Sequence, residues 1–148
     1  MEWQLAFIEA LYSFKMADTG IRRFIEALLE IARKNGKSTF LAADGTTDLF
    51  IGAGGSELCC ASNDDKQCRY IWREIAGMRQ RLDPKRALTS QNLTEIRNDR
   101  KNILISRMSS KTQNKDGGNF TKTFQDESHD VDEENGNCEI AEACWRSM

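Results

Sequence analysis

The residue types between positions 33 and 39 could together hold a polyphosphate. The segment reads Arg33-Lys34-Asn35-Gly36-Lys37-Ser38-Thr39. Where a Gly-Lys-Ser sequence opens a helix, backbone N–H groups cradle phosphate oxygens, the lysine reaches the β and γ phosphates, and the serine hydroxyl binds Mg²⁺. The general pattern has a further glycine where this chain has Ile31. The segment therefore predicts a phosphate-binding loop that departs from the general pattern at one position.

Two adjacent acidic residues far downstream, Asp126 and Glu127, could complete such a site. An aspartate at the end of a strand can hold Mg²⁺ directly or through water, and a neighbouring glutamate can polarise the water that attacks the γ-phosphate. Each motif by itself also occurs in ordinary loops and on acidic surface turns. In this order and at this distance within one chain, they predict a site for a nucleoside triphosphate with Mg²⁺.

Each of these residues has an expected role. Lys37, Arg33 and Glu127 form the predicted catalytic set: Lys37 neutralises charge on the phosphates, Arg33 reaches the γ-phosphate, and Glu127 orients water. Ser38 and Asp126 are the predicted Mg²⁺ ligands. Plainer alternatives are that Ser38 only caps a helix and that Arg33 is a solvated loop residue. The other predicted nucleotide-binding residues of the loop are Lys34, Asn35, Gly36 and Thr39.

Hydrophobic periodicity predicts the elements that lead into the loop. Apolar residues at helical spacing predict an amphipathic helix over residues 3–15. A strand near Leu28–Ala32 is expected to enter the loop, after a short helix or turn. Asn35 and Gly36 tolerate left-handed backbone angles and so favour a tight turn. The helix that follows should begin over Ser38–Ala43 and break at Asp44–Thr47, whose residues are poor helix formers.

Further along the chain, helices and strands are expected to alternate. Strands are predicted at Leu58–Ala61, at Ile103–Ile105 and immediately before Asp126, with a helix over residues 65–82 that Pro84 ends. Such alternation indicates an α/β fold with a parallel sheet flanked by helices. The last strand contains Lys122 and Gln125, whereas a central strand of a parallel sheet should be almost wholly apolar.

Composition sets the outer limits. With 148 residues, 39% of them hydrophobic and 30% charged, the chain has room for one domain with a core. The five cysteines are odd in number and lack paired metal-ligand spacing, which favours reduced thiols inside a cell. No membrane span or signal peptide is expected. Residues 66–111 are rich in Lys and Arg, which suits either a nucleic-acid backbone or a solvated helix face.

The loop and its surroundings resemble the ATPase domain of the terminase large subunits of tailed phages, which package DNA into capsids. That family's phosphate-binding loop, a deviant Walker A element, also lacks the first glycine and carries an arginine at the position of Arg33. Trp3-Gln4 resembles the family's upstream glutamine element, which implies that Gln4 contacts adenine. Asp126-Glu127 resembles the Walker B element, and the segment 57–67 resembles the strand and helix start after the loop.

The resemblance implies an ATPase whose hydrolysis drives DNA translocation, with ATP and Mg²⁺ as cofactors. The implied partners are double-stranded DNA, the terminase small subunit, the portal protein and further copies in a ring, in the cytoplasm of an infected or lysogenic bacterium. Residues 1–148 would then be an incomplete P-loop ATPase domain without the nuclease domain. The break at Asp44–Asp48 and the polar last strand are departures from the family's pattern.

Two alternatives stay open at this point. Asp126-Glu127-Ser128-His129 also fits a DExH-type helicase or translocase, although Arg33-Lys34-Asn35 fits that class poorly. A non-catalytic remnant of a terminase is favoured by the interrupted helix and the polar strand.

Overall fold

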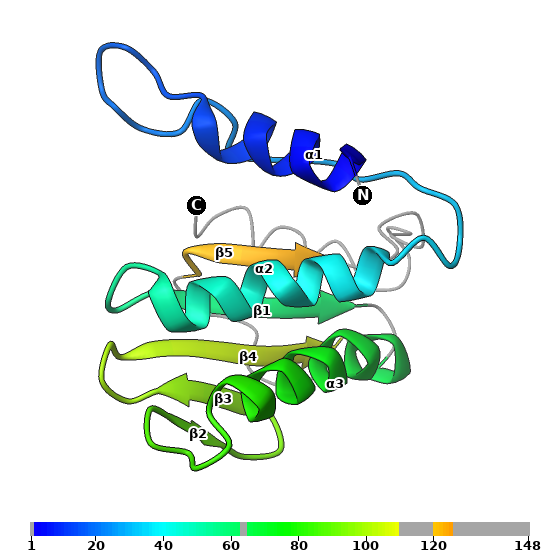
Figure 1. Cartoon of the computed structure of the whole chain (residues 1–148), viewed down its shortest axis with the longest axis vertical. Helices are drawn as coiled ribbons and strands as arrows, with labels where there is room; N and C mark the ends of the chain where they lie inside the picture. Colours follow the sequence, from blue (N-terminus) through cyan, green and yellow to red (C-terminus); the bar gives the residue numbers. More distant parts are fainter. Residues whose placement is uncertain (1, 63–64, 110–119, 126–148) are drawn as a thin grey trace. The chain divides into compact units, whose positions relative to one another are not determined.

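The computed structural model describes residues 2–62, 65–109 and 120–125, and the chain divides into two compact units, Met1–Phe40 and Leu41–Met148. The first unit contains helix α1 (Glu2–Ser13), a long connection and the first turn of helix α2 (Lys37–Ile51). The second contains the rest of α2, a sheet and helix α3 (Asp65–Leu82) (Figure 1). None of the helices in the described part of the chain combines the length and apolar character needed to cross a membrane.

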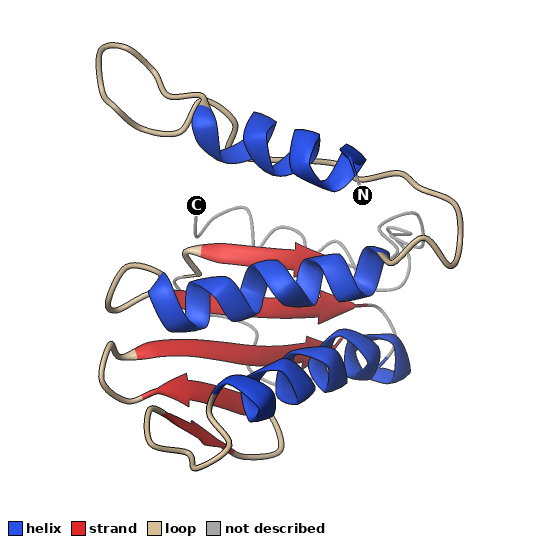
Figure 2. Ribbon diagram, in the orientation of Figure 1, coloured by secondary structure: helices blue, strands red, loops and turns tan. Residues whose placement is uncertain are grey.

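The second unit is built on a mixed sheet of five strands in the order β2-β3-β4-β1-β5. Figure 2 shows the strands side by side with helices α2 and α3 lying across them. β1 pairs in parallel with β4 on one side and with β5 on the other, whereas β3 adds to β4, and β2 to β3, as antiparallel strands. The predicted α/β fold with a parallel sheet flanked by helices is confirmed, and an antiparallel hairpin extends that sheet. The strands are β1 (Glu57–Ser62), β2 (Thr89–Gln91), β3 (Glu95–Asn98), β4 (Ile103–Ser109) and β5 (Lys122–Gln125).

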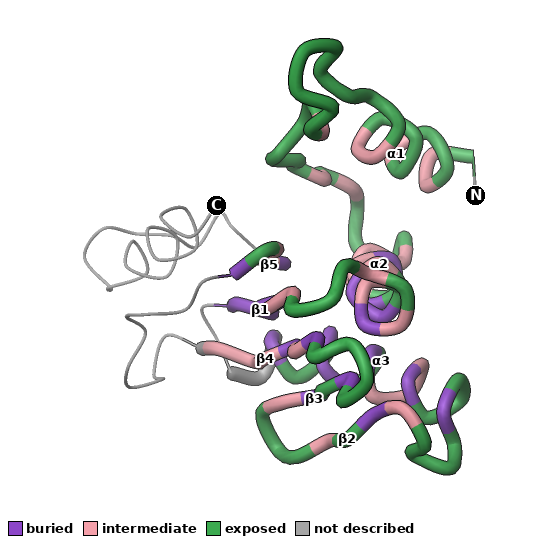
Figure 3. The backbone as a smooth tube through the Cα atoms, turned by 90° about the vertical axis from the view of Figure 1, so that its left-hand side faces the viewer, coloured by how far each residue is buried: buried purple, intermediate pink, exposed green. Residues whose placement is uncertain are grey.

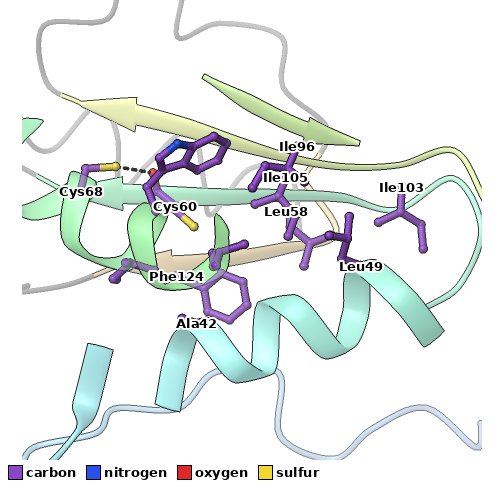
Figure 4. Close-up of a cluster of buried hydrophobic side chains, with 12 residues drawn as sticks. Ala42, Leu49, Leu58, Cys60, Cys68, Ile96, Ile103, Ile105 and Phe124 are labelled. Atoms are coloured by element: carbon purple, nitrogen blue, oxygen red, sulfur yellow. Dashed lines mark hydrogen bonds between the residues drawn. The ribbon is translucent and has the colours of Figure 1, made fainter. Parts of the chain in front are cut away.

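The main core lies between the sheet and the two helices, which cover the same face of it (Figure 3). Because side chains alternate along a strand, Leu58 and Cys60 of β1 enter this core, while Cys59 and Ala61 join Phe120 in a smaller cluster. Burial raises the pKa of the Cys60 thiol, as does the nearby Cys68, so Cys60 stays protonated. The main cluster, drawn in Figure 4, contains Ala42, Leu49, Leu58, Cys60, Cys68, Ile71, Trp72, Ile75, Ile96, Ile103, Ile105 and Phe124.

Helix α2 runs without interruption from Lys37 to Ile51, so the predicted break at Asp44–Thr47 is wrong. The hydroxyl groups of Thr46 and Thr47 donate to the carbonyl oxygens of Ala42 and Ala43, at 2.7 and 2.8 Å, and so remain compatible with the helix. Gly45 faces the ring of Phe124 at the point where β5 approaches the helix. Low intrinsic helix propensity is therefore overridden here by packing and by local hydrogen bonds.

Two helical glycines, Gly45 in α2 and Gly77 in α3, should respond oppositely to alanine. A Cβ on Gly77 meets nothing within 4 Å, so Gly77→Ala should raise the free energy of unfolding by about 1 kcal/mol through helix propensity alone. A Cβ on Gly45 would lie 3.3 Å from Cε2 of Phe124. Overpacking costs about 1–3 kcal/mol, so Gly45→Ala should lower the free energy of unfolding by about 0–2 kcal/mol. Urea denaturation of both variants measures the difference, and equal gains in both would contradict it.

A side-chain cap ends helix α2. Asn98 of β3 is buried, and its Nδ2 donates to the carbonyl oxygen of Leu49 near the end of α2 at 2.9 Å. Its Oδ1 accepts the N–H groups of Arg100 and Lys101, at 3.1 and 3.2 Å. One amide therefore joins the carboxyl end of α2 to the turn between β3 and β4, and it satisfies backbone groups that would otherwise lack partners.

Asp83 makes the corresponding junction after α3. Its N–H donates to the carbonyl oxygen of Arg79, and its carboxylate accepts the N–H groups of Ala87, Leu88 and Thr89. Burial alone would raise the pKa of Asp83, but these donors and the Thr89 hydroxyl lower it to about 2. The ionised carboxylate thus holds the turn that delivers the chain from α3 to β2.

The hairpin β2–β3 was not predicted, because its strands have only three and four residues. A polar side chain builds its turn: Oδ1 of Asn92 accepts the N–H groups of Thr94 and Glu95, at 2.9 and 2.7 Å. The N–H of Asn92 in turn donates to the carbonyl oxygen of Glu95 at 2.9 Å. This pattern, in which an asparagine bonds the backbone two and three residues on, is typical of tight turns.

In the first unit, aromatic side chains make the contacts of α1. The rings of Trp3 and Phe7 lie 5.5 and 5.6 Å from that of Phe40. Leu5 and Ile8, two of the apolar residues at helical spacing that predicted this helix, are 70% and 41% exposed. The helical period over residues 3–15 therefore predicted the helix but not the face that packs.

After α1 the chain turns back on itself, and the N–H of Arg23 donates to the carbonyl oxygen of Phe14 at 2.9 Å. The strand predicted at Leu28–Ala32 does not form: those residues have no regular structure and are absent from every described strand pairing. A strand needs hydrogen bonds from a neighbour, and Leu28 remains 78% exposed. The apolar residues of this segment also recur at helical rather than alternating spacing, so a strand here would have no single apolar face to bury.

Candidate functional site

The loop before α2 has the backbone shape of a tight turn at a helix start. Lys34 and Gly36 have positive φ angles, of 68° and 80°. A Cβ on Gly36 would meet nothing within 4 Å, so the glycine is required by the backbone angle rather than by space. Nδ2 of Asn35 donates to the carbonyl oxygen of Ala32 at 3.1 Å, and α2 begins directly at Lys37. The predicted turn is confirmed at Gly36, and its other left-handed residue is Lys34 rather than Asn35.

Cationic residues are concentrated in the sequence at this helix start. The loop brings three cationic side chains within five residues, Arg33, Lys34 and Lys37, and the first turn of α2 contains no acidic residue. Helix amino-termini carry a partial positive charge and ordinarily favour acidic side chains. A helix amino-terminus flanked by cationic side chains is suited to binding an anion. Lys37, Ser38 and Gly36 are half-buried, whereas the other four predicted loop residues, Arg33, Lys34, Asn35 and Thr39, are exposed.

Helix α1 contacts the first turn of α2 within the same unit. Phe40 follows Thr39 directly, and its ring contacts those of Trp3 and Phe7. Gln4, the predicted adenine contact, is half-buried and adjacent to Trp3 on α1. The structure therefore brings α1, the helix that carries Gln4, into contact with the first turn of α2, and the contact of Gln4 with adenine stays a prediction.

The predicted acidic pair, Asp126 and Glu127, lies outside the described residues, as does His129. The structure describes the strand immediately before it: β5 ends at Gln125 and pairs in parallel with β1. The strand predicted to lead to Asp126 is thus confirmed. The donor set predicted for Mg²⁺, a serine hydroxyl and a carboxylate, consists of hard oxygen atoms, which suit this ion.

Lys122 of β5 makes contacts that the sequence did not indicate. Its Nζ lies 2.9 Å from Oδ2 of Asp44 and 2.6 Å from Oδ2 of Asp48, both on α2. The same cation lies 5.3 Å from the ring centroid of Phe124. Among the described strands β5 is terminal in the sheet, with β1 as its neighbour, so a polar side chain is tolerated there. Lys122 was unexpected in a strand of a parallel sheet, and Asp44 was expected to break α2. In the structure these two residues form an ion pair.

The basic middle of the sequence lies largely on α3 and the turns that follow it. Arg69, Arg73 and Arg81 of α3 are exposed, opposite the buried Ile71 and Ile75. Arg79 is an exception, since it is 3% exposed and its Nη2 donates to Oε1 of Gln91 at 2.8 Å. A solvated face and a surface for a nucleic-acid backbone both remain compatible with this arrangement.

A family model and a solved structure both match this chain. The family model described as terminase large subunit, ATPase domain, matches residues 2–146. The crystal structure of the large terminase of bacteriophage HK97 is similar to this chain, with a TM-score of 0.79 and 20% sequence identity. That match covers 100% of this chain and 31% of the HK97 protein. A comparison with curated proteins gives no match.

At 20% identity the structural likeness establishes the fold, namely the α/β architecture seen in the large terminase. The family model extends over nearly the whole chain and includes the loop, both long helices of the second unit and every described strand. The family that this model identifies is the terminase family and not a DExH-type helicase. The chain belongs to the terminase large subunit family and corresponds to its ATPase domain.

Proposed function

We propose that this chain binds ATP with Mg²⁺ and hydrolyses it as part of a motor that packages double-stranded DNA. The observation that carries the proposal is the start of α2, where Arg33, Lys34 and Lys37 lie within five residues of sequence around a left-handed turn at Gly36 and the first turn of the helix contains no acidic residue. A helix amino-terminus of this kind is suited to a polyphosphate. Membership of the terminase family makes ATP the expected polyphosphate.

In this proposal the loop residues act by position and charge. Backbone N–H groups of the loop and the first turn of α2 hold the phosphate oxygens, and Lys37 neutralises charge on the β and γ phosphates. Ser38 and Asp126 hold Mg²⁺, which supplies further neutralisation when bound. Glu127 orients the attacking water, Arg33 stabilises charge at the γ-phosphate, and Gln4 contacts adenine.

The proposed partners follow from the family. They are double-stranded DNA, the terminase small subunit, the portal protein and further copies of the chain in a ring, within the cytoplasm of the bacterial host. The chain spans 31% of the HK97 large terminase, so residues 1–148 are proposed to be part of a P-loop ATPase domain without the nuclease domain. The exposed arginines of α3, Arg69, Arg73 and Arg81, are candidates for contact with the DNA backbone.

A non-catalytic remnant is the competing proposal, and the structure removes two of its arguments. The helix that was expected to break at Asp44 is continuous, and the lysine in the last strand is paired with two carboxylates. Neither feature is therefore a sign of decay. What separates the two proposals is whether the loop binds and turns over ATP.

Replacing Lys37 with alanine should slow ATP hydrolysis by about 10²- to 10³-fold, the usual cost of removing one group that stabilises developing charge. The measurement is phosphate release by the purified chain in the presence of Mg²⁺, with and without double-stranded DNA. Binding of a fluorescent ATP analogue should weaken in the same variant, because Lys37 contacts the phosphates in the bound state as well.

Lys85→Ala is the matched control, since Lys85 is an exposed lysine in the turn after α3 and should leave both readouts unchanged. Failure of the wild-type chain to bind the analogue would support the remnant instead. Turnover that is equal in the wild type and in Lys37→Ala would remove the loop from the reaction.

A further inference from the structure

Exposed apolar side chains are concentrated in the first unit. Among the described residues, eight of the twelve large hydrophobic side chains that are exposed lie between Leu5 and Leu28. Single apolar residues are common on protein surfaces, whereas a concentration of them marks a surface that meets a partner. Three of the eight, Phe14, Met16 and Ile21, are 51%, 46% and 63% exposed and lie on one short hairpin that follows α1 (Figure 1).

Two backbone hydrogen bonds define this hairpin, residues 14–23. The N–H of Arg23 donates to the carbonyl oxygen of Phe14 at 2.9 Å, and the N–H of Met16 donates to the carbonyl oxygen of Ile21 at 2.8 Å. Because side chains alternate along a strand, these four residues share one face of the hairpin. Met16 and Ile21, beside the turn, form the apolar part of that face.

Two cations are paired on the opposite face. Lys15 and Arg22 form the antiparallel pair between the two hydrogen bonds, and like charges directly opposite each other are destabilising. The guanidinium of Arg22 lies 5.4 Å from the ring centroid of Tyr12, which holds it in place but supplies no negative charge. Asp18, the acidic residue of the hairpin, accepts the N–H of Thr19 at the turn. Within the described residues neither cation of the pair has a carboxylate partner.

The backbone of this pair leaves room for a further strand. In a pair of this type the N–H and carbonyl groups of both residues point outward, along the two edges of the hairpin. The edge at Lys15 directly follows α1, which ends at Ser13, whereas the edge at Arg22 leads into residues 23–28, all of them exposed. An extended segment paired with this Arg22 edge would continue both faces, with alternate side chains beside the cations and beside the apolar residues.

We propose that the Arg22 edge binds an extended segment of a partner protein in which acidic and apolar residues alternate. The carboxylates of that segment lie beside Lys15 and Arg22 and relieve their repulsion, and its apolar side chains cover Ile21. The same hairpin of a second copy would instead set cations against cations. Duplex DNA would match the cations but would leave the apolar residues uncovered. This inference goes beyond the proposed function and does not depend on nucleotide binding.

The test measures binding of a fluorescein-labelled peptide, in which glutamate and valine alternate, to the full chain by fluorescence anisotropy. A peptide of the same composition, with all glutamates before all valines, is the control and should bind about 10-fold more weakly, because it cannot match both faces. The double substitution Lys15→Gln, Arg22→Gln should raise the Kd of the alternating peptide about 3- to 10-fold, as the loss of two exposed ion pairs does. Removing two exposed cations of the second unit, by Arg81→Gln with Lys85→Gln, should leave this Kd unchanged.

Further variants separate the two faces and the backbone. Ile21→Ser should weaken binding, whereas Leu28→Ser, which removes an apolar side chain that is 78% exposed but lies outside the hairpin, should not. Lys15→Glu with Arg22→Glu should lose the glutamate peptide and bind one with lysine in its place, which also shows that the variant is folded. Methylating the peptide nitrogens on one edge should abolish binding, and methylating those on the other edge should not, because only one edge pairs with the hairpin.

Four outcomes would overturn the inference. They are no binding of the alternating peptide, equal binding of the two peptides of one composition, equal binding of the two methylated peptides, and no effect of the substitutions at Lys15 and Arg22. If those substitutions instead weaken binding of duplex DNA while the peptide does not bind, the hairpin contacts DNA and the proposal is wrong. None of these outcomes bears on the loop before α2, so the proposed function is tested separately.

Discussion

Glutamine in place of Glu127 should leave ATP binding intact and slow hydrolysis by about 10²- to 10⁴-fold, the range over which a positioned acid–base group contributes. The substitution keeps the size of the side chain and removes the carboxylate that would orient and polarise the attacking water. Ground-state contacts to the nucleotide are not made by this residue in the proposed site. Single-turnover phosphate release and equilibrium binding of a fluorescent ATP analogue, both with Mg²⁺, measure the two effects separately.

Two neighbouring acidic residues make this expectation specific. Asp130→Asn removes the same charge from the same acidic run and should leave turnover unchanged. Asp126→Asn should instead weaken the binding of ATP in the presence of Mg²⁺, because a metal ligand acts in the bound state. Equal slowing by Asp130→Asn and Glu127→Gln would point to the general acidity of the segment, and a fast Glu127→Gln enzyme would exclude the assigned role.

Removing the Phe124 ring should cost the fold about 3–5 kcal/mol of unfolding free energy, as large-to-small substitutions of buried aromatic residues do. Phe124 is 4% exposed and belongs to the cluster between the sheet and the helices, where it contacts Gly45 and lies close to Ala42 of α2 (Figure 4). The cavity left by Phe124→Ala would lie between α2 and β5. Urea denaturation followed by far-ultraviolet circular dichroism measures the change.

Phe14 offers a matched control for the loss of a ring. It is 51% exposed and meets Phe24 edge-on, so Phe14→Ala should change the free energy of unfolding by about 1 kcal/mol or less. A double-mutant cycle sharpens the result: in the Phe124→Ala background, Gly45→Ala should become stabilising, because the ring that it would clash with is gone. Additive effects of the two substitutions would contradict the close contact between them.

Local sequence patterns predicted the elements whose signal lies within a few residues. The apolar run at Leu58–Ala61 and the amphipathic period of residues 65–82 match β1 and α3 closely. The strand at Ile103–Ile105 is the first part of β4. In the loop, Gly36-Lys37-Ser38 predicted both the left-handed turn and the start of the helix, because both depend on residues within this short segment.

The features that were missed depend on residues far apart in the sequence. Asp44 and Gly45 read as helix breakers until Lys122 and Phe124 are placed beside them, more than seventy positions away. The strand at Leu28–Ala32 was inferred from what a phosphate loop ordinarily needs rather than from its own pattern, and that pattern is helical in period. The roles of Asp126 and Glu127 in the site remain predictions from the sequence and the family.

The cap made by Asn98 has a consequence for the order in which the second unit can form. Leu49 and Asn98 are joined by a hydrogen bond across 49 positions of sequence, and the same side chain closes the turn at Arg100 and Lys101. The last turn of α2 therefore acquires its cap only when β3 has paired with β4. We therefore expect helix completion and hairpin closure to be one cooperative event, in which the carboxyl end of α2 opens together with the β3–β4 turn.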